Sequence, residues 1–144
     1  MRTDDVIAAI NWLDGRSEVD MDRLSVLATG ALGPVALHAA VLDDRIGQVT
    51  LDGSIVSYRE FVERPVSRDM AEVNMPGVLR RYDLPDLMAV LGDRLTLSNP
   101  VNSIGETMTA AQVAAAAPGL SNLVFRGVRD PVAAPAPPSR SSRP

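Results

Sequence analysis

The sequence predicts an α/β fold in which parallel strands alternate with helices. Four short apolar segments end in polar or turn residues, as strands do: 24–28, 48–51, 94–98 and 122–126. The stretches between them carry helical spacing of apolar residues or helix-capping patterns. Because strands that alternate with helices form right-handed crossovers, we expect a four-stranded parallel sheet flanked by helices.

Length and composition fit one aliphatic domain followed by a tail. The chain has 144 residues, of which 46% are hydrophobic and only 3% aromatic, so its core must be built from aliphatic side chains. From residue 130 onward Pro, Ala, Ser and Arg dominate, a composition too poor in apolar side chains to pack. We therefore expect a folded domain over 1–129 and a disordered tail over 130–144.

Several classes of function are disfavoured by composition alone. A net charge of −4 argues against nucleic-acid and anionic-membrane partners. The absence of Cys removes thiol nucleophiles, and a single His argues against a metal site, so we expect neither a metal nor a cofactor. No apolar run has transmembrane length, and the acidic start differs from a signal peptide, which favours the cytoplasm.

The first half of the chain predicts a strand, a tight turn and a buried helix. A helix over 3–16, with Thr3 as its cap, precedes the apolar strand 24–28. This strand is expected to be covered on both faces, as in a buried parallel sheet. Gly30 and Gly33 permit a sharp turn, and the apolar segment after Pro34 predicts a buried helix.

The second half predicts shorter elements with clear helix starts. A helical turn is expected over 57–62 and a short helix over 75–82. Asp83 and Thr109 each precede a helical pattern and are expected to cap it. Asp86 fits the first turn of its helix, and the pair Asp43–Asp44 is interpreted as a solvated helix end.

Several segments together resemble the C-terminal half of α/β-hydrolases. The residues that carry this resemblance are 26–40, 51–58, the stretch PGVLRRYDLPDL at 76–87, and Asn99-Pro100-Val101. The likeness extends over about residues 5–128 and is strongest to acetyl xylan esterases and related polysaccharide deacetylases. It implies a partial α/β-hydrolase fold whose strands correspond to the last four of the family's sheet, without the early strands that complete its oxyanion hole.

The resemblance also implies that this chain lacks the family's catalytic triad. When the G-x-S-x-G elbow is laid on residues 28–32, Gly30 occupies the place of the nucleophile, between Thr29 and Ala31. The position of the acid holds Asn102, and no His follows Gly105. The resemblance therefore implies a truncated hydrolase half that is inactive alone, or a scaffold half of an esterase assembled with a partner.

Two other functions remain open from the sequence. Residues 28–33 differ by one residue from a dinucleotide-binding fingerprint, in which Gly30 and Gly33 would shape the phosphate turn and Asp52 would bind a ribose. A weak ester hydrolase with a non-standard nucleophile is the other alternative. His38 lies within an apolar helix and is interpreted as a structural histidine.

The resemblance predicts a partner as well. In the complete fold, the strand 24–28 is paired along both edges, whereas a half-sheet leaves one edge unpaired. Because exposed apolar edges pair with other chains, we expect a homo-oligomer, or a separately encoded N-terminal half, to bind along Leu24 to Ala28.

Overall fold

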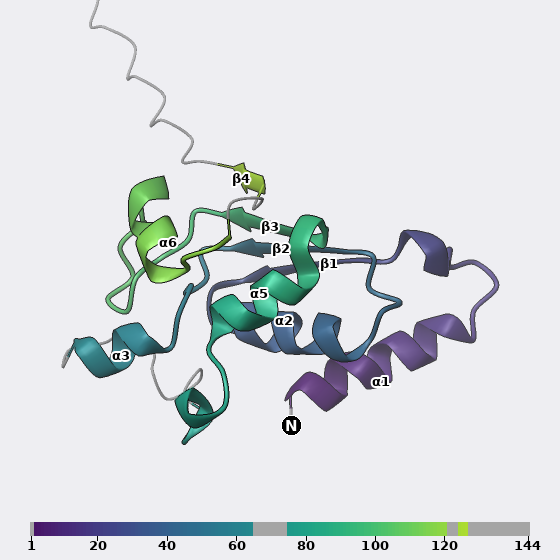
Figure 1. Cartoon of the computed structure of the whole chain (residues 1–144). Coiled ribbons are helices and arrows are strands. Elements are labelled where there is room, and N and C mark those ends of the chain that lie inside the picture. The colour runs from purple at the N-terminus through teal and green to yellow at the C-terminus, as the bar shows by residue number, and fades with distance from the viewer. Residues whose placement is uncertain (1, 65–74, 121–123, 127–144) are drawn as a thin grey trace, which may run out of the picture.

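The computed structural model describes residues 2–64, 75–120 and 124–126, and it places a parallel sheet beside a layer of helices (Figure 1). The strands β1 (Ser25–Thr29), β2 (Gln48–Asp52) and β3 (Leu95–Ser98) lie side by side in chain order. A short segment, β4 (Val124–Arg126), pairs in parallel with β3. The order of the strands places β1 at one edge of the sheet.

One helix precedes β1, and the others lie between consecutive strands. The helices are α1 (Arg2–Asp14), α2 (Gly33–Leu42), α3 (Arg59–Glu63), α5 (Leu84–Leu91) and α6 (Ala110–Ala116). Short 3₁₀ turns lie at Met21–Arg23, Gly30–Leu32, Val78–Arg80 and Gly92–Arg94. Figure 1 shows α1, α2 and α5 gathered on one side of the sheet, where α2 packs against both α1 and α5.

In the described part of the chain, the core lies between the sheet and this layer of helices. Ala28, Val49, Leu51, Leu95 and Leu97 alternate along their strands and are buried. On the opposite face Leu27 is 71% exposed, and Ser25 and Thr29 are also exposed. The prediction that β1 is covered on both faces is therefore wrong: α2 packs against one side of this strand, and the side chains on its other side are exposed.

A cluster around Arg45 ties α1 to the loop after α2. The guanidinium of Arg45 donates to Asp14 at 3.1 Å, to Asn11 at 2.6 Å and to the Asp43 carboxylate at 2.6 and 2.9 Å. Asp43 is buried, and its hydrogen bonds with Arg45 hold the pKa of its carboxyl below the usual range. The interpretation of Asp43 as part of a solvated helix end is wrong, since this carboxylate closes the joint between two elements.

The start of α1 also differs from the prediction. The helix begins at Arg2, and Thr3 lies inside its first turn with only 8% of its surface exposed. Thr3 therefore does not cap this helix. The first-turn acids Asp4 and Asp5 are in place, where they complement the positive end of the helix dipole.

The predicted starts of the later helices are confirmed. Asp83 and Asp86 form a capping box at α5, and Thr109 and Gln112 form one at α6. The expected helix over 75–82 is instead a single 3₁₀ turn, preceded by Gly77 in the left-handed region at φ +78°. A left-handed residue interrupts helical backbone, so the segment folds as a turn.

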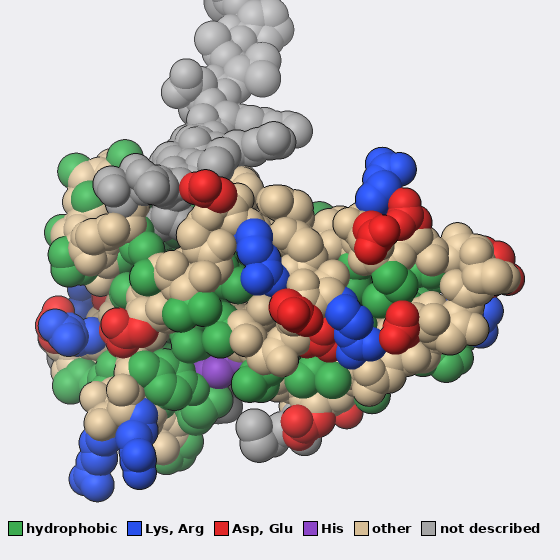
Figure 2. Space-filling model, turned by 45° about the vertical axis from the view of Figure 1, so that its right-hand side comes forward, with side chains coloured by type: hydrophobic (Ala, Val, Ile, Leu, Met, Phe, Trp, Pro, Cys, Tyr) green, Lys and Arg blue, Asp and Glu red, His purple; other side chains and the backbone are tan. Residues whose placement is uncertain are grey.

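The α/β class and the parallel sheet are thus confirmed, and the assignment of this sheet to a hydrolase half stays a prediction. The predicted tail over 130–144 lies outside the described residues. None of the helices in the described ranges is long and apolar enough to cross a membrane. On the face seen in Figure 2, acidic and basic side chains are interspersed rather than gathered by sign.

Candidate functional site

The turn between β1 and α2 has the backbone of a strand-to-helix elbow but no reactive side chain at its apex. Thr29 ends β1 and is exposed, and Gly30 then adopts φ +55° in the left-handed region. A Cβ built on Gly30 would meet no heavy atom within 4 Å. Ala31 continues into the 3₁₀ turn that leads to α2. The apex is therefore open, and it presents only a hydrogen where a nucleophile would stand.

Polar residues line the carboxyl edge of the sheet beside this turn. The register pairs Thr29 with Asp52 and Asp52 with Ser98. Asp52 accepts a hydrogen bond of 2.8 Å from the side-chain amide of Asn99, which itself adopts a positive φ of 44°. The structure thus brings Thr29 and Asp52 together, but the Asp52 carboxylate is used to hold the loop after β3.

Gly33 is required for close packing inside the protein. A Cβ on Gly33 would lie 2.0 Å from the Oγ atom of Ser54, a buried residue in the loop after β2. The missing side chain therefore lets α2 approach that loop. This contact explains Gly33 by packing, whereas the dinucleotide interpretation required it to face a phosphate.

Asn102 is fully engaged within its own loop. Its side-chain oxygen accepts the N–H groups of Ile104 at 3.1 Å and Glu106 at 3.0 Å, and its amide donates to the Glu106 carboxylate at 2.9 Å. The residue is 7% exposed. These bonds fix a tight turn, so Asn102 serves here as a structural residue.

His38 lies on α2 and contacts neither a serine nor a carboxylate among its hydrogen-bond partners. Its Nδ1 atom lies 2.6 Å from the carbonyl oxygen of Pro34, and its Nε2 atom lies 2.7 Å from the hydroxyl of Tyr82. Because the Pro34 carbonyl can only accept, Nδ1 carries the proton in this arrangement. The ring thus fastens α2 to the segment before α5.

Ser57 is the one serine in the described residues that binds a carboxylate through its hydroxyl. Its Oγ donates to Asp83 in a short hydrogen bond and accepts the N–H of Arg59 at 3.0 Å. Asp83 also accepts the N–H groups of Tyr58 and Leu84, both at 2.7 Å. No imidazole contacts this hydroxyl, since His38 is bound to Pro34 and Tyr82. The Asp83 carboxylate that accepts the hydroxyl also holds the N–H groups of Tyr58 and Leu84, so the Ser57–Asp83 pair joins two segments of the fold and lacks the Ser–His pairing of the hydrolase triad.

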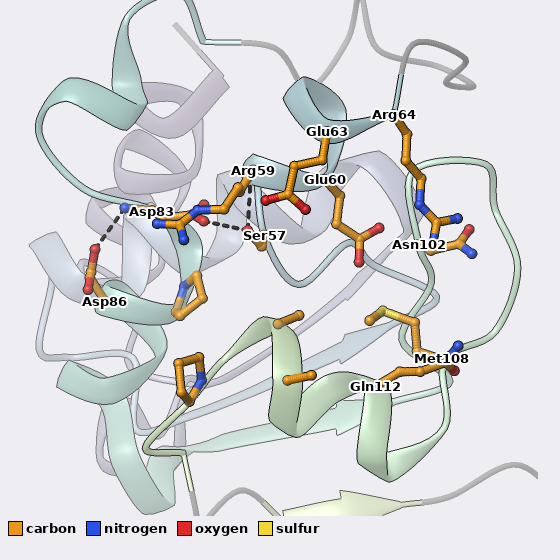
Figure 3. Close-up of a pocket in the computed structure, with 14 residues that line it drawn as sticks. Ser57, Arg59, Glu60, Glu63, Arg64, Asp83, Asp86, Asn102, Met108 and Gln112 are labelled. Carbon is orange, nitrogen blue, oxygen red and sulfur yellow. Dashed lines mark hydrogen bonds between the residues drawn. The ribbon is translucent and has the colours of Figure 1, made fainter.

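A cleft of about 470 Å³ lies between α3, the start of α5 and α6 (Figure 3). Charged residues of α3 and its end form one wall: Arg59, Glu60, Glu63 and Arg64. Small apolar residues and Met108 form much of the opposite wall, including Ala115, Ala116 and Pro118. None of the lining residues belongs to the turn over 29–33, so the cleft is separate from the elbow.

The framework of the cleft is held by hydrogen bonds from the backbone. The carboxylate of Glu60 accepts the N–H of Ser103 at 2.9 Å, and Asp86 accepts the N–H of Asp83 at 2.8 Å. The sequence alone does not single out α3 as part of a cleft, because a five-residue helix gives no periodic signal and its partner wall, α6, comes from a distant part of the chain.

The described residues contain no group of three His, Asp or Glu side chains that is placed to hold a metal ion. No family model, no curated protein and no solved structure matches this chain.

Proposed function

We propose that this chain is the C-terminal half of an α/β-hydrolase fold, of the acetyl xylan esterase kind, and that it is catalytically silent by itself. The sheet class, the strand-to-helix turn and the position of Asn102 in the loop after β3 all agree with that assignment. The proposal treats the chain as a structural half or scaffold rather than as an independent ester hydrolase.

The observation that carries the proposal is the backbone of Gly30. Left-handed φ at the apex of a strand–turn–helix is the conformation that projects a nucleophile out of the sheet in this architecture. Gly30 holds that conformation in open space, and it has no atom that attacks a carbonyl. The left-handed backbone of Gly30 and its missing side chain together support a hydrolase-like turn that has no nucleophile.

The remaining members of a triad are likewise unsuited to the reaction. The side chain of Asn102 is hydrogen-bonded within its own turn. An amide also does not stabilise an imidazolium as a carboxylate does. His38 is bound to Pro34 and Tyr82. Restoring a hydroxyl at Gly30 alone would therefore leave the nucleophile without a base.

The proposed role as a half-fold includes a partner that covers the outer edge of β1. Among the described residues, no strand pairs with this edge. Apolar edge strands bind further strands through their free backbone groups. A second copy of the chain or a separately encoded N-terminal half would meet this requirement.

Catalytic silence is tested by hydrolysis of a chromogenic acetyl ester. We expect the purified chain to release product at the rate of the buffer alone, and the variants Ser57→Ala and His38→Ala to behave identically. Turnover that scales with the concentration of the chain and falls in either variant would overturn the proposal and support an ester hydrolase with a non-standard nucleophile. Turnover unaffected by both variants would be traced by further chromatography to a contaminating esterase.

A further inference from the structure

The outer edge of β1 has a geometry that suits one partner better than others. The carbonyl oxygen of Leu24 accepts the N–H of Gly47, which leads into β2, at 2.9 Å. Because successive peptide groups of an extended strand point to opposite sides, the groups of Val26 and Ala28 turn toward β2 as well. The outer edge therefore carries the N–H and C=O groups of Ser25 and Leu27 and the N–H of Thr29, whose C=O accepts the first bond of the 3₁₀ turn Gly30–Leu32.

The hydrogen bonds between β2 and β3 agree with this assignment of the residues of β1 that face β2 and those that face outward. The N–H of Gly53, directly after β2, donates to the carbonyl oxygen of Ser98 in β3 at 3.0 Å. Residues 51 and 53 therefore turn their backbone groups to β3, and residues 50 and 52 turn theirs to β1. In the register that pairs Val26 with Val49, the N–H of Thr50 is directed to the C=O of Val26. The backbone groups of Val26 therefore face β2, as inferred above.

The outward residues Ser25 and Thr29 lie at equal spacing on either side of Leu27. In an antiparallel pair with an identical strand, Leu27 faces the partner's Leu27, and Ser25 faces the partner's Thr29. Facing residues of this kind exchange both an N–H and a C=O bond. One two-fold register thus pairs both outward groups of each Leu27 and joins each Thr29 N–H to the partner's Ser25 C=O, since the C=O of Thr29 already accepts the first bond of the 3₁₀ turn.

The side chains agree with the same register. Leu27 is 71% exposed on the uncovered face of the sheet. In the two-fold pair the two Leu27 side chains lie next to each other, with Cβ atoms about 5 Å apart, and shield each other from water. A single leucine exposed at the centre of a strand therefore gains an apolar neighbour from a second copy.

Charge places no obstacle to this contact. The chain carries a net charge of −4, but residues 24–29 contain no charged side chain. The strand also has no proline, lysine or bulge, which are the devices that keep edge strands from pairing. Two copies therefore meet along a neutral strand rather than across their acidic surfaces.

We propose that the partner of β1 is a second copy of this chain, bound through antiparallel β1–β1 pairing centred on Leu27. The proposal names the partner of the half-fold described above and in that sense rests on the proposed function. It predicts a two-fold dimer with a continuous sheet that runs through both protomers.

The absence of cysteine from the chain permits a direct test by Leu27→Cys. The predicted pair places the two Cα atoms about 5.5 Å apart, a separation at which disulfides form. We expect Leu27→Cys to oxidise to a disulfide-linked dimer at least about tenfold faster than Leu42→Cys, a matched control whose leucine is 70% exposed at the end of α2. Equal rates for the two variants would overturn the register.

Light scattering on the full chain provides the second readout. We expect the mass of a dimer for the unmodified chain and that of a monomer for Leu27→Arg, with unchanged circular dichroism. A folded monomer without the substitution would overturn the proposal, and so would a dimer that Leu27→Arg leaves intact. Neither result bears on ester turnover, so failure here is distinguishable from failure of the catalytically silent assignment.

Discussion

A single glycine decides the chemistry of the strand-to-helix turn. Gly30 holds the left-handed φ that this turn needs, and its surroundings leave room for a larger residue. Space is therefore not the reason for a glycine at this position. The residue fulfils the conformational requirement of the turn at low steric cost, and it leaves the apex without a functional group.

The two glycines of the turn are predicted to differ in their tolerance of alanine. Gly33→Ala places a Cβ against Ser54, whereas Gly30→Ala meets only backbone strain. We expect Gly30→Ala to lower the free energy of unfolding by about 1 kcal/mol and Gly33→Ala by about 2–3 kcal/mol. Urea unfolding measures both.

The double variant Gly33→Ala, Ser54→Gly removes the atoms against which the new Cβ collides. We expect it to be more stable than Gly33→Ala alone. If Gly33→Ala were tolerated as well as Gly30→Ala, the close approach of α2 to the loop after β2 would be disproved.

The burial of Tyr58 predicts an alkaline transition. Removal from water, followed by the charges of Tyr82 and Asp83, raises the pKa of the Tyr58 hydroxyl to about 12. Because this value lies above the ordinary value of 10.0, folding favours the neutral hydroxyl. The associated stability is complete below pH 10 and is lost as the pH rises through about 12.

Absorbance at 295 nm measures this ionisation, since the chain has only two tyrosines. We expect one of them to ionise together with alkaline unfolding, and Tyr58→Phe to remove that late component. A native protein in which both tyrosines ionise near pH 10 would contradict the buried environment of Tyr58.

At the scale of elements, one carboxylate joins the loop after β2 to the start of α5. Asp83 caps the helix and accepts the N–H of Tyr58 and the hydroxyl of Ser57. We expect Asp83→Ala to lower the free energy of unfolding by about 2–4 kcal/mol, because it removes a helix cap and leaves partly buried donors unpaired.

The matched control for Asp83 is Asp93→Ala. Asp93 is an exposed acid in the turn before β3, and its removal is expected to change the urea midpoint little. Equal effects of the two substitutions would show that Asp83 does not join these elements.

Local signals allowed most elements to be predicted. The capping residues Asp83 and Thr109 begin helices where the sequence places them, because a cap depends on residues within one turn. The start of α1 and the role of Asp43 were not predictable in this way. Arg45 joins residues from α1 and from the loop after α2, and such a contact depends on the tertiary fold.

At the scale of the whole molecule, the exposed face of β1 is the largest departure from the sequence-based expectation. The apolar run of β1 is typical of a strand buried on both faces, yet Leu27 faces solvent. An apolar run indicates that a strand can be buried, but it does not show which segment or partner covers each face. The cleft beside α3 was also missed, because its walls come from segments distant in the sequence.

The proposal that this chain lacks a nucleophile is tested most directly with a fluorophosphonate, which reacts covalently with activated serines. Intact mass spectrometry after incubation is predicted to show the unmodified mass of the chain, since Gly30 offers no hydroxyl and no imidazole is bonded to Ser57. A stoichiometric adduct that maps to a serine of the native chain, and that disappears when the chain is first unfolded, would contradict a catalytically silent half-fold.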